Sequence, residues 1–146
     1  MDTTRVRLFS ARFRAQPLPQ IKTVDQAKLK KIQEDLAAKA GTHQNTLSRI
    51  IGYLWQSFER VPGFQAREEK FNLSSALASC GISPHDNVYV YWDDKDELES
   101  FRMEELSDKF KGIWFANMDN IVLFDDSFLW ILYVNSNGDL MKKKFS

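Results

Sequence analysis

The stretch "FLWILYVNSNGDLMKKK", residues 128–144, decides the fold of this chain because it predicts a β-hairpin. Residues 128–134 are aromatic or branched aliphatic side chains, which favour a strand. Asn137-Gly138 follows, and this dipeptide favours a type I′ turn, whose two central residues both adopt positive φ. The second strand ends in three lysines, at positions 142–144. Natural sheets often protect an exposed edge with lysine, so we expect this strand to lie at the edge of its sheet.

The turn type also predicts which residues face each other across the hairpin, because loop length fixes the register. A two-residue turn at Asn137-Gly138 places Val134 opposite Met141 and Leu132 opposite Lys143. The hairpin therefore predicts antiparallel pairing in the C-terminal half of the chain.

Three more strand candidates precede the hairpin. Residues 88–92, "VYVYW", are apolar on both faces, which is typical of a strand in the interior of a sheet. Residues 113–115 and 121–124 are shorter candidates. Between them, "FNLSSALASCGIS" and "MEELSDKFK" have the composition of short helices that end at Gly81 and Gly112.

The N-terminal half has the periodicity of helices instead. Residues 24–40 repeat apolar side chains at helical spacing, and Gly41 is a suitable stop. A second apolar stripe begins near Asn45 and continues to Val61, where Pro62-Gly63 would end the helix. Residues 5–14, "RVRLFSARFR", fit a strand with a break and a short amphipathic helix equally well.

These patterns together predict an α+β fold, with an N-terminal helical layer packed on one face of a mainly antiparallel, meandering sheet. At 146 residues the chain has the length of a single domain, 1–146. We expect its helical part to span about residues 1–80 and its sheet-rich part about residues 86–146.

The charge is distributed unevenly along the chain. Formal net charge is zero, but residues 86–126 hold 12 acidic and 4 basic side chains, a net charge of −8. Such asymmetry points to a charged partner rather than to a fold. One cysteine cannot form an intramolecular disulfide, and no apolar run has the length of a membrane span. We therefore expect a cytoplasmic protein without a membrane partner; the arginines of residues 1–19 leave an organelle transit peptide as the alternative.

No motif in the sequence gives positive support for an enzyme. Cys80 and His85 are the only thiol and base close in sequence, and Cys80 lies among small residues typical of a core. A calcium loop threaded through residues 93–105 lacks the required glycine, and zinc lacks ligands. Neither phosphate-binding glycine motif occurs. We expect no cofactor and no small-molecule substrate, although carboxylates from separate loops remain a possible metal site.

The basic N-terminal half makes nucleic acid a candidate partner. Arg5, Arg7, Arg12 and Arg14 alternate with phenylalanines that stack well on bases. The acidic second half would repel a phosphate backbone, so we consider nucleic acid a less suitable partner than a protein. An adaptor whose partner contacts the basic helices is a further alternative.

The carboxylates themselves are the strongest functional signal. In "VYVYWDDKDELESF", residues 88–101, five acids fall within seven positions at the end of a strand, and more acids precede and follow residues 121–124. If the loops after residues 92 and 124 lie together, they form an acidic surface near Trp92, Phe101, Trp114 and Phe115. Such a surface suits a basic protein partner, with aromatic anchors and acids that steer association. Asp125-Asp126-Ser127 equally fits a simple tight turn.

The tail "GIWFANMDNIVLFDDSFLWILYVNSNGDL", residues 112–140, resembles a pattern in immunity proteins of bacterial contact-dependent growth inhibition and related polymorphic-toxin systems. The resemblance covers about 50 residues from Val88 onward. It implies a cytoplasmic protein that binds and blocks a cognate toxin, often a nuclease with a basic cleft. The partner-binding residues, chosen on charge and placement, are Trp92, Asp93, Asp94, Asp96, Glu97, Glu99, Asp119, Asp125 and Asp126.

Overall fold

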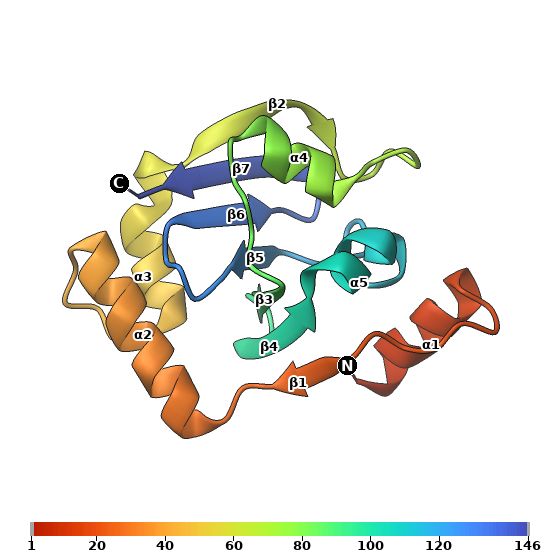
Figure 1. Cartoon of the computed structure of the whole chain (residues 1–146), viewed down its shortest axis with the longest axis horizontal. Helices are drawn as coiled ribbons and strands as arrows, with labels where there is room; N and C mark the ends of the chain where they lie inside the picture. Colours follow the sequence, from red (N-terminus) through yellow and green to blue (C-terminus); the bar gives the residue numbers. More distant parts are fainter. Residues whose placement is uncertain (1, 146) are drawn as a thin grey trace.

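The computed structural model describes residues 2–145 and is built on a seven-stranded sheet in which all paired strands are antiparallel (Figure 1). The strand order is β1-β4-β3-β5-β6-β7-β2. The strands are β1 Ile21–Thr23, β2 Glu59–Gln65, β3 Asn87–Trp92, β4 Glu97–Arg102, β5 Ile121–Phe124, β6 Trp130–Val134 and β7 Asp139–Lys144. The α-helices of this part are α1 Thr3–Arg12, α2 Gln26–Ala40, α3 Leu47–Leu54, α4 Leu73–Ser79 and α5 Met103–Asp108. The predicted α+β fold is confirmed.

Helices cover both faces of the sheet rather than one. The alternation of β3 shows why: Val88, Val90 and Trp92 pack with α1, α4 and α5, whereas Tyr89 and Tyr91 pack with α2 and α3. Figure 1 shows α2 and α3 lying together, apart from α1, α4 and α5. A strand that packs against helices on both faces needs apolar residues at every position. Residues 88–92, "VYVYW", meet this requirement.

The second predicted helix is shorter than its apolar stripe suggested. α3 ends at Leu54, a short 3₁₀ helix Trp55–Ser57 follows, and Val61 belongs to strand β2. Strand β2 pairs with β7 and forms one edge of the sheet. An edge strand tolerates Pro62, which has no backbone N–H to donate. The lysine-rich β7 is therefore an interior strand, and its predicted place at the edge was wrong.

The predicted register of the C-terminal hairpin was wrong by one residue. Val134 faces Leu140 and Leu132 faces Lys142. Of the residues 135–138 that form the turn, Gly138 alone has positive φ, at 90°, so this is a three-residue loop closed by a left-handed glycine and not a type I′ turn. The Asn135 side chain selects this loop because its Oδ1 accepts the Asp139 amide at 2.9 Å.

Two more segments differ from their predictions. Residues 113–115 follow a 3₁₀ helix, Phe110–Gly112, and form no strand, although Ile113 and Trp114 are buried. Residues 3–12 adopt the helical alternative, α1, capped by the Asp2 side chain. No helix within residues 2–145 is long and apolar enough to cross a membrane.

Candidate functional site

The nine predicted site residues lie at two opposite ends of the sheet. β3 runs antiparallel to β5, with Trp92 opposite Ile121 and Tyr89 opposite Phe124. The loop after Trp92 therefore lies beside the start of β5, while the loop after Phe124 lies beside the start of β3. The prediction that these two loops meet was wrong, because adjacent antiparallel strands place their C-terminal ends at opposite ends of the sheet.

Four of the nine side chains are buried: Trp92, Glu99, Asp119 and Asp125. Asp119 receives two hydrogen bonds from the guanidinium of Arg5 in α1 and a third, of 2.7 Å, from the Phe115 amide. Buried carboxylates need such partners, and here they tie the N-terminal helix to the loop before β5. The protein's own groups therefore satisfy the buried Asp119 carboxylate.

Trp92 and Glu99 complete the same internal network. The Arg5 guanidinium lies 4.2 Å from the centre of the Trp92 ring, and the Trp92 indole N–H donates to Glu99 Oε1 at 2.7 Å. A cation stacked on tryptophan and a satisfied indole donor are what a buried tryptophan of this kind requires. Trp92 and Glu99 therefore hold the hairpin in place from within the core, and both side chains are buried.

Asp125, at the opposite end, accepts four hydrogen bonds. Ser127 donates its amide at 3.0 Å and its hydroxyl at 2.5 Å to Oδ1, while the His85 amide and the Trp130 indole donate to Oδ2 at 2.8 and 3.1 Å. Burial alone would raise the pKa of Asp125, but these hydrogen bonds outweigh burial and lower the pKa. The tight-turn alternative therefore describes Asp125 well.

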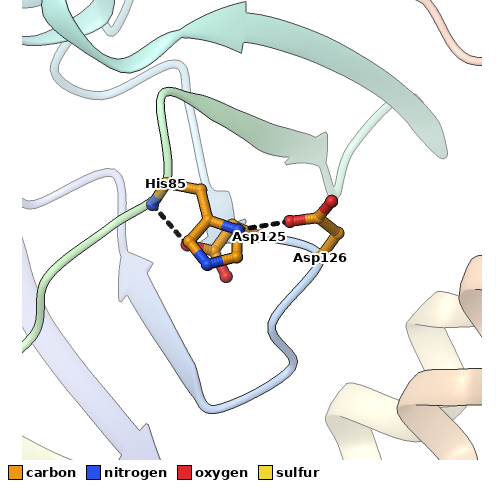
Figure 2. Close-up of side chains that lie close together, drawn as sticks. All are labelled: His85, Asp125 and Asp126. Atoms are coloured by element: carbon orange, nitrogen blue, oxygen red, sulfur yellow. Dashed lines mark hydrogen bonds and ion pairs between the residues drawn. The ribbon is translucent and has the colours of Figure 1, made fainter.

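His85, Asp125 and Asp126 form a cluster whose potential ligand atoms all lie within 4.8 Å of one another (Figure 2). His85 Nδ1 and Asp126 Oδ1 are 2.6 Å apart, and the side chains are 55% and 65% exposed. The hydrogen bond to Asp126, helped by the charge of Asp125, raises the pKa of His85. A metal fits poorly here, because a carboxylate has about four acceptor positions and those of Asp125 are all occupied.

A cleft of about 620 Å³ adjoins His85 on one side. Its lining mixes acids, a base and hydroxyls: Ser74, His85, Asp86, Arg102, Glu104, Ser107 and Asp108 are among them. The two serines bond to each other at 2.8 Å, so neither hydroxyl is paired with His85. The His85 Nδ1 atom contacts Asp126 instead, at 2.6 Å.

The remaining predicted residues form the tip of the β3–β4 hairpin, which we call the acidic hairpin: Asp93, Asp94, Asp96 and Glu97, all exposed. Asp96 has φ of 52°, a left-handed conformation that aspartate tolerates in tight turns. Its carboxylate accepts the Tyr91 hydroxyl at 2.7 Å, which fixes the turn against the α2–α3 face. All four residues belong to the run of acids predicted from the sequence to bind a partner, and all four are accessible to solvent.

Electrostatic repulsion is present within the acidic hairpin. Burial and the neighbouring charges of Asp94 and Asp96 raise the pKa of Asp93. The one cation of the loop, Lys95, forms an ion pair with Asp2 and lies over the Trp92 ring. The hydrogen bond from Lys95, together with that from the Arg5 amide, lowers the pKa of Asp2 to about 2. Because Asp2 engages this lysine, the four hairpin carboxylates keep a largely uncompensated negative charge.

The aromatic residues expected near this surface are largely covered. Phe101 and Trp114 are buried and Phe115 is partly buried. Trp55, by contrast, is 47% exposed, and its ring meets Tyr133 edge to face at 5.2 Å. Sequence reasoning missed Trp55 because it assigned the residue to a continuous helix. Its place outside the apolar stripe 47, 50, 54, 58 was the available signal.

The basic N-terminal segment is partly used within the fold. Arg5 is buried against Asp119, and Arg12 pairs with Glu69. Arg7 and Arg14 remain exposed. Arg12 is exposed as well, so the segment presents three surface arginines, one of them in an ion pair, instead of the four considered from the sequence.

Comparisons with protein-family models, with curated proteins and with solved structures find no match to this chain.

Proposed function

We propose that this protein is an inhibitory binding module, of the kind that bacterial immunity proteins represent, and that it docks a basic toxin domain on its acidic hairpin. The observation that carries the proposal is the geometry of that hairpin. Four exposed carboxylates project from one turn, and the lysine among them is held by Asp2. A cationic partner would relieve this repulsion, as positive patches on nuclease domains do when they meet acidic inhibitors.

The sequence resemblance of residues 88–140 to immunity proteins supports the same proposal. In that role the protein acts in the cytoplasm, has no catalytic activity and needs no cofactor, because it blocks the toxin by covering its active-site cleft. The acids at the rim steer association, and contacts that become fully buried limit dissociation.

The test begins with the neighbouring gene: if it encodes a toxic domain, protection and binding are measured with that domain, and a neighbour that encodes no toxin would count against the proposal. Co-expression of the wild-type chain should restore growth to cells that express the toxin. The triple variant D93K/D94K/E97K should lose protection, and its association rate at low salt should fall about tenfold or more. Asp96 is kept because its carboxylate bonds the Tyr91 hydroxyl and its φ is positive. The control is E59K/D108K, which reverses one exposed acid of β2, at the far edge of the sheet, and one exposed acid at the end of α5.

Circular dichroism should show that both variants remain folded, because surface changes usually alter stability by about 0.5 kcal/mol or less each. A folded triple variant that associates at the wild-type rate at every salt concentration would remove the acidic hairpin from the interface. Absence of protection by the wild-type chain would reject the immunity function itself.

A further inference from the structure

A small pocket of about 390 Å³ lies where strands β1 and β4 meet the start of helix α2. Its lining brings together three basic side chains from three different elements: Lys22 of β1, Lys28 of α2 and Arg102 of β4. Arg102 is the last residue of β4, whereas Glu97 of the acidic hairpin is the first. The basic pocket and the acidic hairpin therefore lie at opposite ends of the same strand.

The register of the sheet explains why these side chains converge. Lys22 faces Ser100 of β4, and Ser100 in turn faces Tyr89 of β3. Arg102 comes two residues after Ser100, so it projects from the same face of the sheet, and Asn87 lies directly opposite it. Tyr89 packs with α2 and α3. The polar side chains of the pocket thus belong to the face that these two helices cover elsewhere.

The helical cover ends above this part of the sheet. On the same face of β4, Leu98 is buried in the cluster under α2 and α3, whereas Ser100 is half-buried and Arg102 is exposed. Lys28, in the first turn of α2, has its Nζ atom 5.6 Å from the centre of the Tyr89 ring. The pocket is therefore an open, polar part of a face that is otherwise apolar and covered.

The positive charge of the pocket is poorly compensated. Lys22 and Lys28 take part in no ion pair among residues 2–145, and Arg102 meets two glutamates of α5 only at 3.9 and 4.0 Å, too far for hydrogen bonds. Asp25 also lines the pocket, but its Oδ1 accepts the Lys28 amide at 2.8 Å as the cap of α2. Three cations against one carboxylate give the lining a net charge of +2.

We propose that Lys22, Lys28 and Arg102 bind the phosphate group of a small phosphate monoester. Such a group has a charge of about −1.5 to −2 at pH 7 and three acceptor oxygens. A guanidinium donates two parallel N–H bonds to a phosphate, and each lysine adds a compact charge. The Ser100 hydroxyl and the Asn87 amide, which also line the pocket, add neutral donors. A single carboxylate has one charge and matches this lining less well.

The size of the pocket sets the size of the ligand. At about 390 Å³ it lies near the lower limit of small-molecule sites, which range from about 300 to 1,000 Å³. A phosphate group with a short organic substituent suits this volume. The inference goes beyond the proposed function, because it concerns a different ligand and a different part of the sheet.

The experiment titrates ¹⁵N-labelled protein with sodium phosphate, glycerol 3-phosphate and sodium malonate at pH 7.5, with ionic strength held constant by sodium chloride. Both phosphates should shift the amides of Thr23, Ser100 and Arg102 in a saturable way, with a dissociation constant of about 1 mM or lower for glycerol 3-phosphate. The amides of the acidic hairpin should not shift. Malonate, a dicarboxylate of similar charge, should bind more weakly.

Substitutions test the three cations separately. Arg102→Gln should raise the dissociation constant of glycerol 3-phosphate about tenfold or more, because it removes charge-assisted hydrogen bonds. Lys22→Gln and Lys28→Gln should each raise it about twofold to fivefold. Lys30→Gln is the matched control: Lys30 is an exposed lysine of the same helix that lines a different cavity, and its replacement should leave the dissociation constant unchanged. The amide spectra also report whether each variant remains folded.

Several results would overturn the inference. Shifts that do not saturate, or a folded Arg102→Gln variant that binds as the wild type does, would reject the site. Malonate binding as tight as that of glycerol 3-phosphate would reject the assignment to phosphate, and binding of inorganic phosphate alone would reject the monoester. The growth-protection assay judges the proposed function independently of these titrations.

Discussion

Arg5 and Asp119, 114 positions apart in the sequence, form a doubly hydrogen-bonded ion pair in which both side chains are buried, at 5% and 0% exposure. Arg5 also donates to the Ile113 carbonyl at 3.2 Å. The pair joins α1 to the segment that precedes β5, and the stacking of Arg5 on Trp92 extends the connection to the base of the acidic hairpin. The N-terminal helix is thereby part of the support of the candidate site.

Removing one partner of this pair should be strongly destabilising, because it leaves a buried charge without compensation. We expect Asp119→Ala and Arg5→Met each to lower the free energy of unfolding by about 3 to 5 kcal/mol. The double variant should lose less than the sum of the two. Urea unfolding followed by circular dichroism gives these values, and losses below about 1 kcal/mol for both single variants would contradict the buried ion pair.

Gly112 allows α1 to approach closely. A Cβ atom at this position would lie 2.6 Å from ring carbons of Phe13 and 2.7 Å from one of Phe9. Gly112→Ala should therefore push α1 outward, with a stability loss of about 1 to 3 kcal/mol and faster proteolysis near residues 12–16. Gly52→Ala in α3 is the control, since no atom lies within 4 Å of its Cβ, and it should stabilise the helix by about 1 kcal/mol. Equal effects of the two substitutions would argue against the close packing.

Asp125 should make stability depend on acid pH. Its pKa is lowered in the folded protein, so its contribution is fully present above the ordinary aspartate pKa of about 3.9 and is lost as the pH falls through the folded pKa. Asp125→Asn should cost about 2 to 3 kcal/mol at pH 7, because it places an amide donor among four donors. The difference from wild type should shrink below pH 4. A difference that stays constant from pH 7 to pH 2 would contradict this assignment.

His85 should titrate at a higher pH than an unperturbed histidine. Its pKa is raised, so the stability it contributes is present below the ordinary value of about 6.5 and is lost as the pH rises through the folded pKa. Asp126→Asn should lower the pKa of His85 toward the ordinary value. Proton NMR of the imidazole signals in both proteins measures this, with His85→Gln for assignment. An unchanged titration curve in Asp126→Asn would show that Asp126 is not the cause.

The acidic hairpin should reduce stability at neutral pH. The pKa of Asp93 is raised, so its repulsion with Asp94 and Asp96 develops as the pH rises above about 3.9. Asp94→Asn should therefore raise the melting temperature slightly at pH 7 and low salt, by an effect of about 0.5 kcal/mol or less, and should have no effect at pH 3. Added salt should remove the gain by screening. Asp94→Asn should also bind a basic partner more slowly. A gain in stability with an unchanged association rate would show that the repulsion within the hairpin is not linked to partner binding.

Local signals in the sequence were sufficient for most of the fold and for the exposed part of the site. The two-sided apolar pattern of residues 88–92 identified an interior strand, and the run of acids after it identified the acidic hairpin. The hairpin register could not be predicted from Asn137-Gly138 alone, because the Asn135 side chain bonds the Asp139 amide and selects a longer loop. Strand β2 was missed because its pairing with β7 overrides the helical stripe that ends at Val61.

Local sequence patterns could not predict that several acids are buried and paired with groups from distant segments. Asp119 looks like an exposed acid until the fold brings Arg5 to it, and no pattern within either segment records a contact over 114 positions. The tight turn predicted for Asp125 is present, because its bonds from Ser127 join residues only two positions apart. The bonds from His85 and Trp130, which complete its burial, depend on the sheet.

The ion pair between Asp2 and Lys95 has a practical consequence for laboratory work with this protein. It brings the second residue of the chain next to the acidic hairpin, whereas Phe145 is bonded to Leu129 at the opposite end of the sheet. An affinity tag or dye attached ahead of Asp2, above all a cationic one, would occupy the neighbourhood of the binding surface and mimic a partner. Labels and immobilisation handles therefore belong after Phe145, where they leave the hairpin free.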